Sequence, residues 1–345
     1  MLTSFRSLSD IYTGPFDTII DVRSESEFLE DHVPGAINLP VLNDAERAEV
    51  GTIYVQDCSF KARKIGAALV ARNAARHLEE SLSDHAGGWQ PLVYCWRGGQ
   101  RSGSFASILT QVGWRTSLLE GGYRTYRRLV VEALYDAPFL PPVYLLDGNT
   151  GTAKTRILEK LGDLGVQVLD LEGLAHHRGS LFGGFRDGQP SQKSFEGALA
   201  QAITPLDPSR PVVIEAESSK IGERMVPPSL WAAMKAAPRL RISAPLEARA
   251  AYLTRAYSDL IADKGVLRET IQKLRSLHSS DQIAIWHDMA ETGEFEALAG
   301  SLMEEHYDPR YRKGDKVAEF TFDVDGLDEG DLDQVAARIG KYLGR

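Results

Sequence analysis

A single cysteine stands where an apolar run ends, in LVYCWRGGQRS, residues 92–102. Arg97 and Arg101 follow it, with paired glycines between them. Glycines tolerate positive φ, so the loop can turn its backbone N–H groups toward the sulfur. The arginines and a following helix N-terminus favour the thiolate over the thiol. We therefore predict a group-carrying, nucleophilic Cys95 assisted catalytically by Arg97 and Arg101, against the alternative of a buried structural cysteine.

A second loop has the residue types that bind phosphate, in GNTGTAKT, residues 148–155. It lies between a strand-like and a helix-like segment, which is the context that a Walker A loop requires. Its backbone N–H groups can cradle a diphosphate, Lys154 can neutralise charge, and Thr155 could hold Mg²⁺. The motif normally has glycine at position 153. The phosphate-binding residues predicted in this loop are Gly148, Asn149, Thr150, Gly151, Thr152, Ala153, Lys154 and Thr155.

Two further segments could complete an anion site. LEGLAHHRGSLFGGF, residues 171–185, offers Arg178 and Ser180 as predicted phosphate donors. Its adjacent histidines titrate near neutrality, and a structural role for both is an equal alternative. PVVIEAES resembles a Walker B strand with Glu215 or Glu217 at its end, and a solvated strand terminus is the alternative for those carboxylates.

Alternating strands and helices must position these loops. Up to residue 135, apolar strand patterns alternate with helical ones, which predicts an α/β domain with a parallel sheet covered on both faces. We expect a helical insertion near residues 43–90. The proline-rich DAPFLPP, residues 136–142, predicts a linker. A P-loop-like α/β domain with a mainly helical C-terminal part is expected over residues 143–345.

Charge and composition limit the class of protein. A net charge of −9 argues against a protein that coats nucleic acid indiscriminately. Residues 58–77 and 97–128 are locally basic, with Glu120 as the one carboxylate in the two segments. Two cysteines, no visible secretory signal and no apolar run of roughly 18 residues predict a cytoplasmic protein with reduced thiols and no membrane span. Cys58 has no His or Cys at metal-ligand spacing, so we expect a structural or incidental thiol and no metal site.

The N-terminal residues resemble a rhodanese domain. In IIDVRSESEFLEDHVPGAINLP, Asp21 and Arg23 match its DxR element and residues 32–36 match its H-x-P-G-A element, while YCWRGGQRS matches its active loop. Rhodaneses carry sulfur or selenium on that cysteine, which implies the same for Cys95. Cysteine phosphatases are a rival because the loop also has C-x5-R spacing, although Tyr94 stands where they usually have histidine.

Nearly the whole chain, from about Ile20 to about Arg312, resembles the bacterial tRNA 2-selenouridine synthase family. The motifs beyond the rhodanese segment are ERAEVGTIYVQ, RGGQRS, LEGGYR, DLEGLAHHRGSLFG, SSKIG and EEHYDPRY. The resemblance implies two steps on the wobble uridine of tRNAs that carry 2-thiouridine. Geranyl diphosphate first alkylates the sulfur, and selenophosphate then supplies selenium that replaces the geranylthio group. Cys95 would hold that selenium as a perselenide.

The resemblance also implies tRNA as the partner, with an enzyme that supplies selenophosphate as a further candidate. We expect tRNA to dock on the two basic segments. The predicted tRNA-binding residues are Lys61, Arg63, Lys64, Arg124, Arg127 and Arg128. The residues leave open whether the Walker loop takes geranyl diphosphate, a nucleotide or selenophosphate. Two other functions stay open: a sulfurtransferase or cysteine phosphatase fused to an ATPase, and a non-catalytic RNA-binding regulator.

Overall fold

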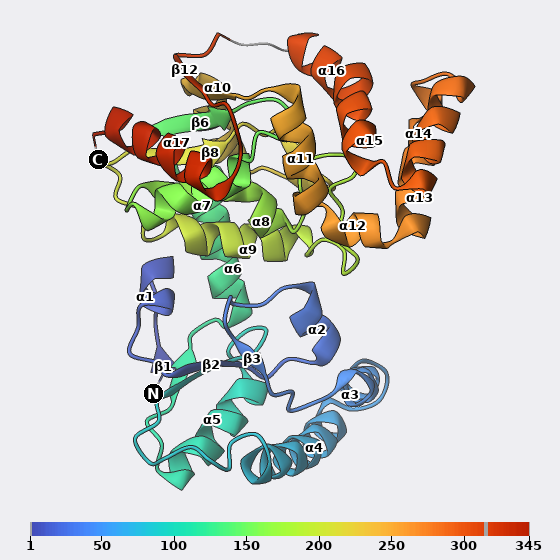
Figure 1. Cartoon of the computed structure of the whole chain (residues 1–345). Coiled ribbons are helices and arrows are strands. Elements are labelled where there is room, and N and C mark those ends of the chain that lie inside the picture. The colour runs from blue at the N-terminus through green and yellow to red at the C-terminus, as the bar shows by residue number, and fades with distance from the viewer. Residues whose placement is uncertain (1, 314–316, 345) are drawn as a thin grey trace. The chain divides into compact units, whose positions relative to one another are not determined.

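The chain folds into two compact units (Figure 1). The computed structural model describes residues 2–313 and 317–344. The first unit comprises Met1–Pro138 and Pro190–Pro205, and the second comprises Phe139–Gln189 and Leu206–Arg345. Residues 190–205 therefore belong by their contacts to the first unit, although they follow the proline-rich segment 136–142 in the chain.

The first unit is built on a five-stranded parallel sheet in the order β1-β5-β4-β2-β3. Helices α4 and α5 lie on one face and α1, α2 and α6 on the other (Figure 1). Apolar side chains of β2 and β4, among them Ile20 and Val93, pack against Val70 of α4 and Phe105 of α5. The strands are β1 (Leu2–Thr3), β2 (Thr18–Asp21), β3 (Ile37–Asn38), β4 (Pro91–Tyr94) and β5 (Ser117–Leu119).

Helices α3 and α4 form an antiparallel pair in the expected insertion. A capping box between Asn43 and Glu46 begins α3, and Cys58 is the N-cap residue of α4. Asn73 of α4 donates to the Glu46 carboxylate at 2.7 Å, which fixes α4 to the start of α3. The helices of this unit are α1 (Leu8–Tyr12), α2 (Glu25–Glu30), α3 (Asp44–Gln56), α4 (Ser59–Glu79), α5 (Gln100–Val112), α6 (Tyr123–Val131), the turn η1 (Glu132–Asp136) and α9 (Gln192–Ile203).

The second unit has its own five-stranded parallel sheet, in the order β12-β11-β6-β8-β7. Helices α7 and α17 lie side by side against it (Figure 1), and their apolar faces share one core with Leu146, Val213 and Ile242 of the strands. The strands are β6 (Val143–Asp147), β7 (Gln167–Leu169), β8 (Val212–Glu215), β11 (Arg239–Ser243) and β12 (Phe320–Asp323), and β9 (Lys220–Ile221) pairs with β10 (Arg224–Met225) in a small hairpin.

The C-terminal part of the second unit is mainly helical and has a separate core around Trp286, Leu267 and Ile271. The two parallel sheets and this helical part confirm the α/β fold class predicted from the sequence. Across the described ranges, no helix is both long and apolar enough to cross a bilayer. The helices of this unit are α7 (Lys154–Asp163), α8 (Leu171–Ala175), α10 (Pro228–Ala236), α11 (Leu246–Ala256), α12 (Ser258–Ala262), α13 (Lys264–Gln272), η2 (Lys273–Ser276), α14 (Ser280–Thr292), α15 (Phe295–Leu302), η3 (Met303–Tyr307), α16 (Asp308–Lys313) and α17 (Glu329–Tyr342).

Candidate active site

Cys95 lies directly after β4, at the carboxyl edge of the first sheet, and is 3% exposed. Its Sγ accepts a hydrogen bond from Ser102 Oγ at 3.0 Å, from the first turn of α5. This hydrogen bond holds the sulfur against the start of α5. Ser102 was not singled out from the sequence, although it stands seven residues after the cysteine and one after Arg101.

The cysteine loop is held in shape by the glycine turn between β5 and α6. Gly98 has a φ of +66°, and a Cβ on Gly122 would lie 2.2 Å from the Cys95 carbonyl oxygen. That carbonyl accepts from the backbone N–H of Tyr123 at 2.8 Å, and the N–H of Arg124 donates to Trp96 O at 3.2 Å. The two loops approach so closely at Gly98 and Gly122 that only glycine fits at these two positions.

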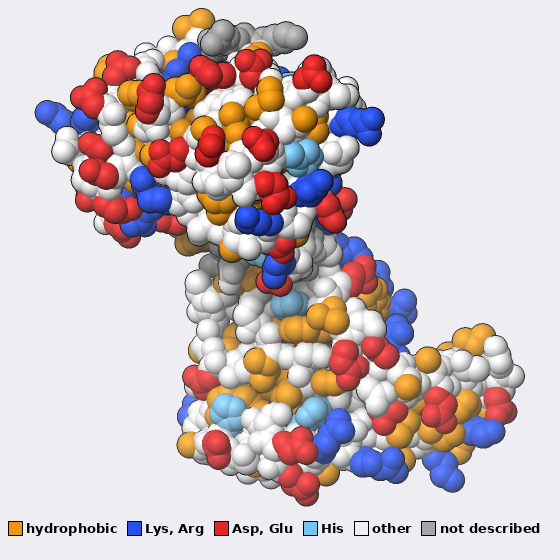
Figure 2. All heavy atoms as spheres, turned by 45° about the vertical axis from the view of Figure 1, so that its right-hand side comes forward, with side chains coloured by type: hydrophobic (Ala, Val, Ile, Leu, Met, Phe, Trp, Pro, Cys, Tyr) orange, Lys and Arg blue, Asp and Glu red, His pale blue; other side chains and the backbone are white. Residues whose placement is uncertain are grey.

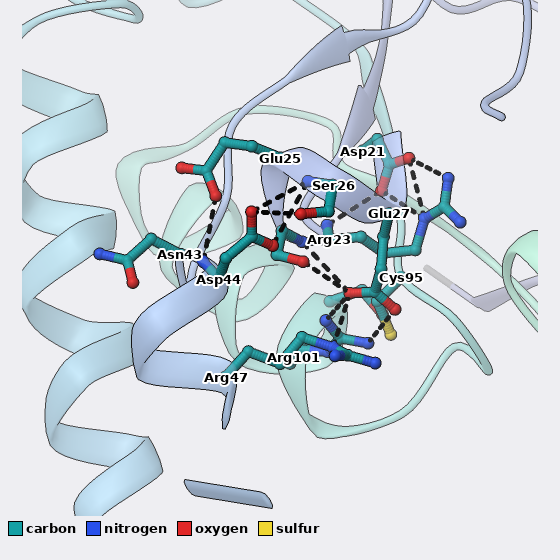
Figure 3. Close-up of polar contacts among 12 residues, drawn as sticks. Asp21, Arg23, Glu25, Ser26, Glu27, Asn43, Asp44, Arg47, Cys95 and Arg101 are labelled. Atoms are coloured by element: carbon teal, nitrogen blue, oxygen red, sulfur yellow. Dashed lines mark hydrogen bonds and ion pairs between the residues drawn. The ribbon is translucent and has the colours of Figure 1, made fainter. Parts of the chain in front are cut away.

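Glu27 of α2 binds the Arg101 side chain beside the sulfur (Figure 3). Its Oε2 lies 2.8 Å from Arg101 Nη1 and 3.0 Å from Nε of Arg47 in α3. Burial raises the pKa of Glu27, but the hydrogen bond and charge of Arg101, with the charge of Arg47, outweigh burial and leave that pKa lowered. Glu27 is therefore ionised and neutralises part of the arginine charge predicted to face Cys95.

Arg97 differs from Arg101 in being exposed and, within the part of the chain that the structure describes, in forming no ion pair. Both arginines line an open pocket of about 470 Å³ with Cys95 in its wall, together with Glu27 and Arg47. The predicted catalytic residues thus come together in one pocket. Arg97 is the cation available to an incoming anion, whereas Arg101 is a fixed part of the pocket wall.

Asp21 and Arg23, the residues of the DxR element, form a buried ion pair at the same sheet edge. Arg23 Nη2 lies 2.6 Å from Asp21 Oδ2 and also donates to the Asp31 carbonyl at 2.6 Å. Its guanidinium stacks over the Tyr123 ring, 4.1 Å from the centroid. These contacts tie the β2–α2 segment to the start of α6, so the pair positions the loops around Cys95 without reaching the pocket.

The predicted phosphate loop follows β6 and precedes α7 in the second unit. Gly148 and Gly151 have φ of +154° and +85°, and Ala153 has a φ of +56°, in the left-handed region. Lys154 Nζ donates back to the Gly148 carbonyl at 3.1 Å, across the loop. Positive-φ residues before a helix N-terminus are the backbone arrangement in which N–H groups can be directed at an anion, as predicted for this loop. The alanine has the backbone conformation for which the motif normally uses glycine.

A group of glutamates lies near Thr155, the last residue of the phosphate loop and the second residue of α7. Thr155 Oγ1 donates to Glu172 Oε2 at 3.1 Å. Burial raises the pKa of Glu172 to about 8, and the charge and hydrogen bond of Glu217 act in the same direction. Glu215 is fully buried and accepts from the Leu171 N–H at 3.0 Å, and burial raises its pKa too. Of the two Walker B candidates, Glu217 therefore contacts Glu172, which in turn accepts from Thr155. Glu215 instead accepts from the first residue of α8.

Arg178 and Ser180 lie beside this carboxyl cluster. A Cβ on the intervening Gly179 would meet the side chains of both Glu172 and Glu217 within 3 Å. Arg178 Nη2 pairs with Asp259 at 2.9 Å, whereas its Nη1 is buried without a hydrogen-bond partner. A buried guanidinium nitrogen of this kind lacks the acceptor that an anionic oxygen would supply.

The adjacent histidines occupy different environments. His177 Nδ1 accepts from the Gly179 N–H at 3.1 Å, and burial lowers the pKa of His177. His176 has a φ of +48° and its Nδ1 lies 2.7 Å from the Gly188 carbonyl oxygen. Both rings therefore hold loop backbone in place. Within the described ranges, no group of three or more His, Cys, Asp or Glu side chains is arranged to hold a metal ion.

Three of the six predicted tRNA-binding residues form ion pairs within the first unit, and the other three are exposed. Arg127 is bound to the buried Glu196 of α9, which also accepts from Tyr135. Lys61 and Arg128 form exposed ion pairs with carboxylates four residues away in the chain, Asp57 and Glu132. Arg63, Lys64 and Arg124 are exposed. An open groove of about 980 Å³ between α3 and α4 includes Arg63 and continues to Arg101 of the cysteine pocket. Figure 2 shows basic side chains gathered along the lower rim of the first unit.

Comparison with known proteins gives matches in both units. A family described as the rhodanese-like domain matches residues 6–129, and one described as the tRNA 2-selenouridine synthase AAA domain matches residues 141–273. The tRNA 2-selenouridine synthase of Alcanivorax borkumensis is 31% identical over 325 residues, covering 85% of this chain and 88% of that protein. The synthase of Chromohalobacter salexigens is 33% identical, covering 85% and 87%.

A third relative matches over a shorter stretch. The tRNA 2-selenouridine synthase of Shewanella halifaxensis is 36% identical over 242 residues, which is 69% of this chain and 65% of that protein. The match thus spans just under two thirds of that relative, whereas the other two are covered nearly throughout. With more than 30% identity over most of the length of these two relatives, and with both domains matched in order, the chain belongs to the tRNA 2-selenouridine synthase family.

Proposed function

We propose that this protein makes 2-selenouridine in tRNA in two steps, a geranylation at the phosphate loop and a selenium transfer at Cys95. The observation that carries the proposal is the presence, in one chain of this family, of a buried thiol in an arginine-lined pocket and a loop of positive-φ residues directly before α7. The two sites correspond to the two chemical needs of the reaction. A thiocarbonyl sulfur leaves poorly, whereas S-alkylation makes C2 electrophilic and turns the sulfur into a displaceable thiol.

In the first step the phosphate loop would hold the diphosphate of geranyl diphosphate as it departs. Backbone N–H groups of the loop and the Lys154 ammonium offset the charge that develops on the leaving diphosphate. Oxygen donors from Thr155 and Glu172 suit Mg²⁺, which prefers hydroxyl and carboxylate ligands shared with phosphate oxygens. A bound Mg²⁺ would supply further charge neutralisation there.

In the second step the Cys95 thiolate would attack the phosphorus of selenophosphate. An S–P bond forms, and the P–Se bond breaks with its electron pair leaving on selenium. The released selenide then attacks C2 and expels the geranylthiolate, and water hydrolyses the S–P bond to give phosphate and free Cys95. The perselenide that the family resemblance implies would instead need a two-electron oxidant, because the selenium of selenophosphate is already at the selenide level. Ser102 and Arg97 stabilise the anions of this sequence, because one donates to the sulfur and the other is exposed at the pocket.

The groove between α3 and α4 is the proposed path of the tRNA to the pocket. It joins the exposed Tyr54 and Arg63 to Arg101 beside the sulfur, and single-stranded RNA binds grooves that combine cations with aromatic rings. Reversing Arg63 and Lys64 to Glu should weaken tRNA binding at least tenfold at low salt. The dependence of log K on log salt should also flatten by about 0.7 to 0.9 for each lost phosphate contact. Arg275→Glu, exposed on the second unit, is the matched control.

Mass spectrometry of tRNA nucleosides tests the function as a whole. Cells that lack this protein should contain 2-thiouridine and no 2-selenouridine at the wobble position, and expression of the chain should restore the selenonucleoside. Restoration by a Cys95→Ser variant would instead favour a binding protein in which the thiol is dispensable. Hydrolysis of a generic aryl phosphate without any change in tRNA would favour a cysteine phosphatase.

A further inference from the structure

An apolar pocket of about 80 Å³ lies in the second unit, next to the phosphate loop. Thr150 of that loop and Ser180 of the 171–185 segment both contribute to its wall. The rest of the wall is almost entirely hydrocarbon, contributed by the helical C-terminal part. Six of the lining residues are Leu253, Leu260, Leu267, Leu298, Leu302 and Met303.

Helix α11 is shared by the loop and the pocket. Arg249 Nη1 donates to the Thr150 carbonyl at 3.1 Å, and Arg249 is fixed by a buried pair with Asp308, with Nη2 2.8 Å from Oδ2. One turn later, Leu253 lines the pocket and would touch a Cβ on Gly151 of the loop at 3.1 Å. The phosphate loop and the apolar pocket therefore both contact the same helix.

Polar donors occur where the pocket meets the phosphate site. Ser180 Oγ lies 3.5 Å from Tyr257 OH, and both residues line the pocket. The Arg178 guanidinium stacks over the Tyr257 ring, 4.7 Å from its centroid, with Nη1 buried and unpaired. An empty apolar cavity lowers stability, since its lining loses packing contacts. A ligand with a phosphate head and a hydrocarbon tail would fill the cavity and pair that guanidinium.

We propose that this pocket holds the hydrocarbon chain of an allylic prenyl diphosphate whose diphosphate lies on the phosphate loop. The inference rests on the proposed function, since it assigns a place to the chain of the alkylating substrate. The allylic carbon then lies at the junction of polar and apolar walls, near Thr150 and Ser180. A ten-carbon chain is larger than the space now open, so its entry requires Met303 and neighbouring leucines to move, which an unbranched thioether side chain does readily.

Filling the pocket tests this assignment. Ala299 of α15 lines the pocket and is half-buried, whereas Ala297 on the same helix is exposed and outside it. In the full chain, Ala299→Phe should weaken binding of tritiated geranyl diphosphate at least tenfold in equilibrium dialysis without tRNA, and should raise its KM in geranylation similarly. Inhibition by inorganic diphosphate, which has no chain, should stay within twofold of wild type. Ala297→Phe should change neither quantity.

Enlarging the pocket gives a second and opposite test, which holds even if Ala299→Phe folds poorly. Phe295 lines the pocket from the same helix, so Phe295→Ala should shift the kcat/KM ratio toward farnesyl over geranyl diphosphate by at least fivefold. Unchanged geranyl binding in Ala299→Phe, or an unchanged chain-length ratio in Phe295→Ala, would overturn the pocket assignment. If the wild-type protein neither binds nor transfers geranyl groups, the proposed function itself fails, whatever the variants do.

Discussion

The two candidate loops occupy equivalent places in two different sheets, yet the side chains beside them differ in charge. Each follows a central parallel strand and precedes a helix, which is where open α/β sheets bind ligands. Beside Cys95, Glu27 is held ionised by Arg47 and Arg101, and Arg97 remains exposed. Beside Thr155, burial and Glu217 raise the pKa of Glu172. The first site thus has spare cationic charge, and the second has carboxyl groups that could share a metal ion with phosphate oxygens.

The loops also differ in how their backbone is stabilised. The cysteine loop needs glycine because the facing turn leaves no room, as the 2.8 Å between a Cβ on Gly98 and the Leu119 carbonyl shows. The phosphate loop places Ala153 in a left-handed conformation and buries its methyl group in the core of the second unit. Similar loops on similar scaffolds therefore reach their shapes by different constraints, one steric and one a balance between strain and burial.

Replacement of the sulfur should have the largest effect and should separate the two sites. Cys95→Ser should abolish 2-selenouridine formation and accumulate S-geranyl-2-thiouridine, because a hydroxyl is less acidic and less polarizable than a thiol and is therefore a much weaker nucleophile. Nucleoside mass spectrometry of tRNA measures both products. Cys58→Ser, at the exposed N-cap of α4, should complete both steps. Wild-type amounts of 2-selenouridine in the Cys95 variant would rule out a nucleophilic role for Cys95 and leave only a structural thiol.

Loss of the loop cation should affect the other step. Lys154→Ala removes the ammonium that donates to the Gly148 carbonyl at the start of the phosphate loop. A lost charge-assisted hydrogen bond costs about 1.5–3 kcal/mol. Geranylation should slow by at least an order of magnitude, while tRNA supplied already geranylated should still be selenated. Lys235→Ala, an exposed lysine of α10, should leave both rates unchanged. Intact geranylation with blocked selenation would mean that the loop binds selenophosphate instead.

The pKa of Glu172 is raised and that of Glu27 is lowered, which predicts a pH dependence of stability that arises in the second unit. The raised pKa of Glu172, about 8, lies above its unfolded value of 4.5. Between these two values the folded chain binds more protons, so the free energy of unfolding falls as pH rises through this range. Glu172→Gln should remove much of that loss, measured by denaturant unfolding at pH 6 and pH 8.5. Glu27→Gln should not, because the pKa of Glu27 is lowered and the group stays ionised throughout.

Much of this comparison could be predicted from the sequence, because loops and strands leave local signals. Apolar runs ending in Cys95 and Gly148 identified both candidate loops. The alternation of elements predicted the first parallel sheet, and the phosphate-loop pattern predicted a second α/β domain. β11 was missed, since RLRIS between two helices has too few apolar residues to be recognised as a central strand.

The long-range partners left no such signal. Glu27 lies 74 residues from Arg101 and Glu196 lies 69 from Arg127, so neither ion pair shows as a spacing pattern. The apolar pocket also leaves no spacing pattern, because its walls come from segments as distant in the chain as Thr150 and Tyr307. The sequence therefore predicted the reactive side chains. It did not predict which arginines are already paired with a distant carboxylate.

The smallest expected effect concerns Ala153, and it tests the contrast between strain and steric contact. Ala153→Gly relieves a left-handed alanine, a gain of about 1 kcal/mol, but adds unfolded-state entropy and removes a buried methyl, losses of similar size. The net change in unfolding free energy should therefore stay within about 1 kcal/mol, with geranylation preserved. Gly98→Ala, the converse change in the cysteine loop, should be clearly destabilising, because its new Cβ meets backbone atoms on the facing turn. Thermal unfolding of both variants decides the point, and equal effects in the two loops would mean that both are held by the same constraint.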